Sequence, residues 1–173
     1  ALEALPGAAL AGDGEPALAA ILDRHKAFAA EAGLDADALL GDLFGQLERL
    51  SAGVGLVGEA SARVRAEILS LGELMASRLG LACLETQGVG AEALDAREAL
   101  HALHEGTETR DYLSNACADG PDPALKKRLD GVSVALTQGF IARNGRGETV
   151  LLGRGGSDTS ATYFAARLEA AEL

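Results

Sequence analysis

Residues 151–158, which read LLGRGGSD, combine residue types that could bind a small charged molecule. Glycines allow a ligand to approach the backbone closely, and the free N–H groups at a helix N-terminus attract anions. Arg154 has a planar guanidinium group that can hold a carboxylate through two parallel hydrogen bonds. The segment therefore predicts a site for a small molecule that carries a carboxylate, a phosphate or both.

The same segment differs from two better-known phosphate-binding loops. A Walker A loop needs a lysine between its last glycine and a serine or threonine, and no lysine is present here. A dinucleotide-binding GxGxxG motif would need a glycine where Asp158 stands. Asp158 instead falls in the first turn of the expected helix, where the helix dipole favours a negative charge by roughly 0.3–1 kcal/mol. A plain strand-to-helix turn with a surface arginine remains the alternative interpretation.

The loop needs a strand that leads into it and a helix that follows it. Residues 132–137 alternate between larger apolar and smaller side chains, which predicts a strand. Asn144-Gly145 is typical of a hairpin turn, and residues 148–152 are expected to form the second strand. Ser157 is a residue type that caps helices, so it predicts the start of the last helix.

The first half of the chain has the residue pattern of helices. Good helix formers and apolar periodicity predict helices over residues 17–30, 36–50 and 58–87. Residues 1–15 are expected to be a frayed helix and a loop, and residues 51–56 a glycine-rich break. A further interruption of the third helix is expected near residues 70–72, where a glycine precedes Glu73.

The pattern changes after Gly88. Residues 89–94 predict a short strand and residues 124–129 a short helix, with an irregular polar segment over residues 106–123 between them. Helices come first and strands later, so the sequence predicts an α/β fold with a helix-rich N-terminal half.

Composition excludes several classes of function. The chain has 173 residues, with 15 Lys and Arg against 26 Asp and Glu, a formal net charge of −11. That charge argues against a nucleic-acid-binding domain and against a basic membrane-surface helix. No apolar run approaches the ~18 residues of a membrane helix, and no basic residue precedes Arg24 as a signal peptide would require. With two cysteines far apart in the sequence, we expect a reduced, cytoplasmic protein.

Three segments resemble the aspartate kinases of the amino-acid kinase family. The first and most specific covers residues 137–170, TQGFIARNGRGETVLLGRGGSDTSATYFAARLEA. Gly72-Glu73-Leu74 resembles the start of the family's GE helix, and the LDAR sequence of residues 94–97 resembles the Asp-x-Arg that follows its next strand. The long hairpin also looks like that of aspartate kinases fused to diaminopimelate decarboxylase.

The resemblance implies an enzyme that phosphorylates the β-carboxylate of L-aspartate with ATP and Mg²⁺, in lysine, threonine and methionine biosynthesis. Glu73 would bind the amino group of aspartate, and Arg154 would hold its α-carboxylate. The same pocket would be lined by the three residues that follow the arginine, Gly155, Gly156 and Ser157. Asp158 would be the catalytic residue, positioning or neutralising groups at the transferred phosphoryl. The family's fold is an αβα sandwich with a mainly parallel sheet, and a homo-oligomer is expected.

The sequence also departs from the family pattern. The family opens with a strand and a Lys-Phe-Gly-Gly-Thr-Ser loop, whereas Lys26, Lys126 and Lys127 all lie away from glycine-rich loops. The family's nucleotide-binding segment would begin beyond Leu173. We therefore expect residues 1–173 to be an interior portion of an amino-acid kinase domain that does not catalyse by itself.

Other interpretations stay open at this point. The chain could belong to an amino-acid kinase with another substrate, or to a non-catalytic module that binds amino acids or forms oligomers. The piece could also dimerise through its apolar helices. His101 and His104, with Glu105, suggest a metal site only weakly, because HxxHE is not a zincin pattern. We expect no metal site and a solvated helix end at these histidines.

Overall fold

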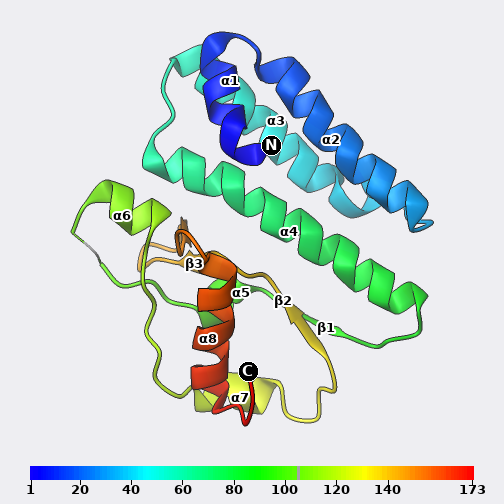
Figure 1. The fold of residues 1–173 in the computed structure, drawn as a ribbon, viewed down its shortest axis with the longest axis vertical. Helices are drawn as coiled ribbons and strands as arrows, with labels where there is room; N and C mark the ends of the chain where they lie inside the picture. Colours follow the sequence, from blue (N-terminus) through cyan, green and yellow to red (C-terminus); the bar gives the residue numbers. More distant parts are fainter. Residues whose placement is uncertain (105) are drawn as a thin grey trace. The chain divides into compact units, whose positions relative to one another are not determined.

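The computed structural model describes residues 1–104 and 106–173. The chain divides into two compact units, Ala1–Gln87 and Gly88–Leu173 (Figure 1). The first unit is helical and consists of η1 (Leu2–Ala4), α1 (Leu5–Ala11), α2 (Gly14–Glu31), α3 (Ala36–Val57) and α4 (Ala62–Thr86). The three helices predicted in this half are confirmed. Asp35 caps α3 as expected, since its carboxylate accepts from the N–H groups of Asp37 and Ala38 at 3.0 and 3.1 Å.

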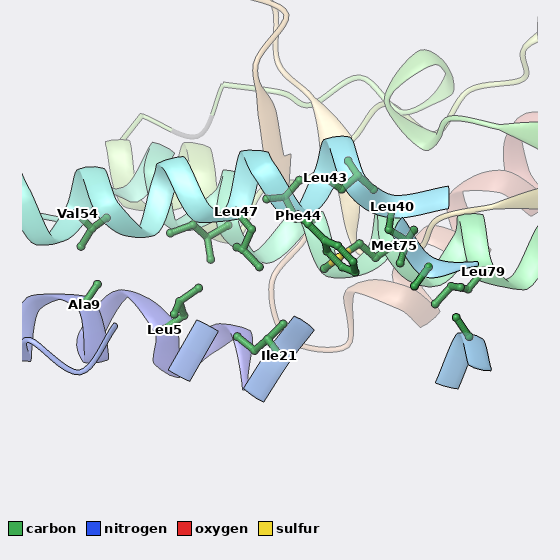
Figure 2. Packing of buried hydrophobic residues seen from close by; sticks show 14 residues of the cluster. Leu5, Ala9, Ile21, Leu40, Leu43, Phe44, Leu47, Val54, Met75 and Leu79 are labelled. Atoms are coloured by element: carbon green, nitrogen blue, oxygen red, sulfur yellow. The ribbon is translucent and has the colours of Figure 1, made fainter. Parts of the chain in front are cut away.

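One apolar core holds these helices together. Leu5 of α1 and Ile21 of α2 point toward Phe44 and Leu47 of α3, with Met75 of α4 beside them (Figure 2). All five of these side chains are buried. The apolar faces of four helices therefore meet in a single cluster.

The predicted breaks in this half are absent because tertiary packing outweighs local propensity. Helix α3 continues through residues 51–56, where Ser51 and Val54 are buried on its inner face. A glycine inside a helix costs only about 1 kcal/mol relative to alanine, which such burial can offset. Helix α4 likewise runs unbroken through residues 70–72. Gly72 has a packing role, because a Cβ there would lie 2.5 Å from Leu2 Cδ1.

The beginning of the chain is also more ordered than the sequence predicted. Residues 1–15 were expected to be a frayed helix and a loop, but Leu5–Ala11 form a regular helix. Leu5 and Ala9 are buried, and Gly12 ends the helix in the left-handed conformation with φ 88°. Burial in the core supplies the stability that so short a helix lacks by itself.

The second unit is α/β. Its elements are β1 (Glu92–Leu94), α5 (Ala96–Ala99), α6 (Glu108–Leu113), α7 (Pro123–Arg128), β2 (Ala135–Thr137), β3 (Ile141–Arg143), β4 (Thr149–Leu151) and α8 (Gly156–Leu168). Strands β1 and β2 pair in parallel, with Ala93 opposite Leu136. Strands β3 and β4 pair antiparallel, with Ala142 opposite Val150. The α/β class and the helix-rich first half are confirmed.

Two details of the second unit differ from expectation. The segment over residues 106–123 contains helix α6, whose N-terminus is capped by the Thr107 side chain. The hairpin forms where Asn144-Gly145 predicted it, but its turn is longer than two residues. The Asn144 N–H donates to the Glu148 carbonyl at 2.9 Å, and the positive φ, 81°, falls at Gly147.

Within the part of the chain that the structure describes, no helix combines the length and the apolar character needed to cross a bilayer.

Candidate functional site

The glycine-rich loop connects the end of β4 to the start of α8. All three residues of β4 are buried, which fixes the point where the loop begins. Helix α8 begins at Gly156, and Gly155 precedes it in the left-handed conformation with φ 71°. Gly155 therefore takes the N-cap position that the sequence had assigned to Ser157, which lies inside the first turn. The prediction of the cap was wrong because the loop closes two residues earlier than expected.

The polar side chains of this loop are exposed. Arg154, Ser157 and Asp158 all face solvent, and Arg154 makes no hydrogen bond or ion pair to any other residue that the structure describes. The Gly156 N–H donates to the Gly153 carbonyl at 3.0 Å, whereas the N–H groups of Ser157 and Asp158 have no acceptor within the helix, as is usual at a helix N-terminus. An unpaired guanidinium and unsatisfied N–H groups thus occur together, an arrangement suited to a bound anion.

The floor of the loop is formed by the segment between β2 and β3. A Cβ on Gly156 would lie 2.5 Å from Phe140 Cδ2, so only glycine allows the helix to start this close to the phenylalanine. Phe140 has φ 68°, and the Ile141 N–H donates to the Gly139 carbonyl across it at 2.8 Å. This is a γ-turn of the rare, positive-φ kind. A phenylalanine in this region costs on the order of 1–3 kcal/mol and persists only where neighbouring contacts impose it.

Two hydrogen bonds impose that conformation. The Phe140 N–H donates to Ser160 Oγ at 2.7 Å, and the Phe140 carbonyl accepts from the Leu152 N–H at 2.9 Å. The start of α8, the last residues before the loop and the β2–β3 connection are therefore joined at one residue.

The Asp-x-Arg sequence after β1 supports the same region. Asp95 and Arg97 form an ion pair, with the Arg97 guanidinium 2.6 Å from Asp95 Oδ2. Partial burial on its own would raise the pKa of Asp95, but the hydrogen bonds from Arg97 outweigh it and lower the pKa. The Ala96 N–H donates to Gln138 Oε1 at 2.8 Å, and Arg97 donates to Thr149 Oγ1 at 3.2 Å. The motif thus ties the ends of β1 and β2 to β4.

Glu73 lies on α4, in the other unit. Its side chain is half-buried, and burial raises the pKa of its carboxyl group. No hydrogen bond or ion pair joins it to another of the described residues. A cation beside such a carboxylate stabilises its ionised form, because the opposite charge offsets the cost of desolvation.

His101 and His104 were expected at a solvated helix end, but neither lies at the end of a helix. His101 makes an isolated parallel bridge with Arg143, and His104 pairs with Asp111 at 2.9 Å. Glu105 lies outside the described residues. Among the residues that the structure describes, no group of three or more His, Cys, Asp or Glu residues is arranged to hold a metal ion.

Gln138, Phe140 and Ser160 are the site residues that sequence reasoning missed. A glutamine, a phenylalanine and a buried serine have no motif of their own. The only available signal was their place, since Gln138 and Phe140 follow the carboxyl end of a parallel strand, where α/β ligands commonly bind.

Comparison with known proteins gives consistent results. Residues 12–173 match the amino acid kinase family. The chain is 40% identical over 135 residues to the bifunctional aspartokinase/homoserine dehydrogenase 2 of Escherichia coli, an alignment that covers 76% of this chain and 16% of that protein. It is 33% identical over 163 residues to the chloroplastic aspartokinase 3 of Arabidopsis thaliana, covering 90% of this chain and 28% of that protein.

A solved structure shows the same fold. The crystal structure of E. coli aspartokinase III in complex with aspartate and ADP superposes with a TM-score of 0.73 at 23% identity. The superposition covers 95% of this chain and 37% of that one. The chain thus spans less than a third of either of the two relatives above and well under half of the solved protein.

Proposed function

The chain belongs to the amino acid kinase family, and from that premise we propose that its full-length protein is an aspartate kinase. The reaction transfers the γ-phosphoryl group of ATP to the β-carboxylate of L-aspartate. The observation that carries the proposal is the exposed, unpaired Arg154 at the start of α8, beside N–H groups free to bind an anion. The aspartokinases among the relatives and the structural neighbour support the choice of substrate.

Arg154 is proposed to hold the α-carboxylate of aspartate. A guanidinium matches a carboxylate through two parallel hydrogen bonds, which fix orientation as well as charge. In this proposal the loop also binds aspartate through its backbone, and Gly155, Gly156 and Ser157 line the pocket.

Glu73 is proposed to bind the ammonium group of the same aspartate. Its half-buried carboxylate is unsatisfied among the described residues, and a bound ammonium would offset the desolvation that raises its pKa. A substrate held at its carboxylate and at its ammonium group has its side chain placed for reaction.

Asp158 is proposed to act at the transferred phosphoryl group, by positioning or neutralising the groups around it. Phosphoryl transfer depends mainly on positioning and electrostatic stabilisation, so no covalent nucleophile is required of this chain. Mg²⁺ would enter as the ATP complex and neutralise phosphate charge. In this proposal the nucleotide-binding residues lie outside residues 1–173, which form an interior portion of the kinase domain and do not catalyse alone.

Three further features belong to the same proposal: the oligomeric state and the fusion partner rest on the family resemblance, and the cytoplasmic location rests on the two cysteines far apart in the sequence. The protein is a homo-oligomer in the cytoplasm. Its hairpin sequence, ARNGRGETVLLGRGGSD, favours the form of aspartate kinase that is fused to diaminopimelate decarboxylase.

The test uses the full-length protein with ATP and Mg²⁺, and traps the acyl phosphate with hydroxylamine on L-aspartate or L-glutamate. We expect aspartyl hydroxamate only. Arg154→Ala should lower kcat/KM about 100-fold to 10,000-fold, because two hydrogen bonds to a charged group are worth about 1.5–3 kcal/mol each. The kcat/KM of Arg154→Lys should fall between those of wild type and Arg154→Ala, since lysine keeps the positive charge but lacks the planar group that makes two parallel hydrogen bonds.

Arg63→Ala is the matched control, because Arg63 is an exposed arginine on the first turn of α4. It should leave kcat/KM within about twofold of wild type. Turnover on glutamate instead of aspartate would indicate another amino-acid kinase. Aspartate binding without turnover in the full-length protein would indicate a non-catalytic amino-acid-binding module.

A further inference from the structure

Ser160 lies one turn inside α8, and its hydroxyl group joins two segments. The side chain is 1% exposed. Its Oγ donates to the Gly156 carbonyl at 2.7 Å and accepts from the Phe140 N–H at 2.7 Å. Both bonding directions of one hydroxyl are therefore used, one within the helix and one to the β2–β3 connection.

Phe140, which donates its N–H to Ser160, has a strained backbone conformation that neighbouring contacts must hold. Phe140 has φ 68°, a backbone conformation that residues other than glycine rarely adopt. Its ring packs against Gly156, and a Cβ on the preceding Gly139 would lie 3.0 Å from the Cα, Cβ and Oγ of Ser157. The β2–β3 connection and the first turn of α8 thus fit together with no spare space.

We propose that Ser160 is a positioning residue, which fixes the start of α8 and the aspartate-binding loop by holding Phe140 in its left-handed conformation. The proposal rests on the proposed function, because it assigns the loop's ligand as aspartate. Ser160 acts through Phe140 and Gly156 rather than on the substrate. When it is removed, the N–H of Phe140 loses its acceptor and the turn relaxes, so Arg154 and the N–H groups of Ser157 and Asp158 are no longer held in place for binding.

The chain offers a matched control on the same helix. Thr162 Oγ1 donates to the Asp158 carbonyl at 3.0 Å, the same four-residue hydrogen bond that Ser160 makes to Gly156. Thr162 is exposed and has no bond to the β2–β3 connection. Comparing the two hydroxyls therefore separates a helix effect from the bond to Phe140.

The first experiment measures the kinetics of full-length wild type, Ser160→Ala, Ser160→Thr and Thr162→Ala by the hydroxamate assay. Ser160→Ala should raise KM for aspartate about tenfold or more and leave KM for ATP within about twofold, because aspartate binding depends on the loop geometry that Ser160 maintains. Ser160→Thr should recover most of the loss, since it keeps the hydroxyl group. Thr162→Ala should match wild type.

A merely structural role would lower the amount of active enzyme and reduce kcat without a change in KM for aspartate. Either a wild-type KM in Ser160→Ala, or no recovery in Ser160→Thr, would therefore overturn the proposal. If the wild type forms no aspartyl hydroxamate, the proposed function fails, and with it the assignment of aspartate to this loop.

A second experiment does not depend on activity or on the folding of any variant. Hydrogen exchange of the wild-type protein is read at single residues by mass spectrometry with electron-transfer fragmentation. The Phe140 amide should exchange as slowly as the buried amides of α8, because a buried hydroxyl accepts its hydrogen bond. Exchange at the rate of an exposed loop would overturn the bond between Ser160 and Phe140, whatever the protein catalyses.

Discussion

The helical unit, residues 1–87, is held by one apolar core between long helices, whereas residues 88–173 combine buried apolar residues such as Leu100, Ile141 and Val150 with side-chain hydrogen bonds that join short segments. In the first unit, long helices contribute leucine, isoleucine, phenylalanine and methionine to a continuous cluster. In the second, each strand has three residues, and Asp95–Arg97, Tyr112–Glu148 and Phe140–Ser160 contacts join the segments. The proposed loop belongs to the second kind of structure.

The difference has a physical reason. A helix satisfies its backbone hydrogen bonds locally and needs only one apolar face to dock, so it tolerates glycines. Short strands cannot satisfy their backbone alone, and polar contacts must fix where each one ends. Polar contacts are directional, so they hold a binding loop to a narrower range of positions than apolar packing does.

The largest expected effect tests the apolar core. Leu47→Ala should lower the opening free energy of α3 by about 2–5 kcal/mol, because it leaves a cavity at a side chain that is fully buried. Hydrogen exchange of the α3 amides in the full-length protein measures this. Leu56→Ala is the control on the same helix, since Leu56 is 89% exposed and should change the value by less than about 0.5 kcal/mol.

The contrast between the two units is supported if the amides of residues 88–173 keep their protection from hydrogen exchange in Leu47→Ala. An equal loss in both units would contradict it, because it would show that they open as one cooperative structure.

Glu73 is the next test, as a half-buried carboxylate in the unit that the apolar core holds together. Glu73→Gln should lower kcat/KM for aspartate about 10-fold to 100-fold, since a hydrogen bond to a charged group is worth about 1.5–3 kcal/mol. The same variant should make α4 slightly more stable at pH 7. A wild-type kcat/KM in the hydroxamate assay would remove Glu73 from the site.

The pH dependence of that gain follows from the raised pKa of Glu73. The buried carboxylate carries its cost only when it is ionised, so the cost is present above the folded-state pKa. It is lost as the pH falls through that value toward the ordinary 4.5. The stability difference between Glu73→Gln and wild type should therefore shrink as the pH falls. A difference that does not change with pH would contradict burial as its cause.

The smallest effect concerns a polar contact of the second unit. Tyr112 donates to Glu148 at 2.7 Å, and Arg146 and Asn144 donate to the same carboxylate. Tyr112→Phe should lower the opening free energy of the β3–β4 hairpin by about 0.5–1.5 kcal/mol at pH 7. Hydrogen exchange of the hairpin amides measures it.

The hydrogen bonds from Asn144, Tyr112 and Arg146 lower the pKa of Glu148 to about 2. Because this pKa is depressed, the stabilisation is fully present above the ordinary 4.5 and is lost as the pH falls from there to about 2. Tyr112→Phe removes one of the three donors, so the loss between pH 4.5 and 2 should become shallower. An unchanged slope would show that the tyrosine does not affect this carboxylate.

Much of the fold was predictable because its signals are local. Asp35 before an apolar stripe marked the start of α3, and Asn144-Gly145 marked the hairpin. The predicted breaks failed at residues 51–56 and 70–72 for a non-local reason. Ser51 and Val54 are buried by other helices, and Gly72 is small because Leu2 packs on it, and neither fact is visible in a sequence window.

Residue types and local patterns were enough to predict the glycine-rich loop and the strand and helix around it, and the net charge of −11 argued against a nucleic-acid-binding domain. Only the tertiary structure decided that Gly155 rather than Ser157 precedes α8, and that Phe140 takes a positive φ against Gly156. It also decided that Ser160 bonds to a residue 20 positions away. Local propensity acts within a few residues, whereas these positions depend on contacts between segments that meet only when the chain has folded.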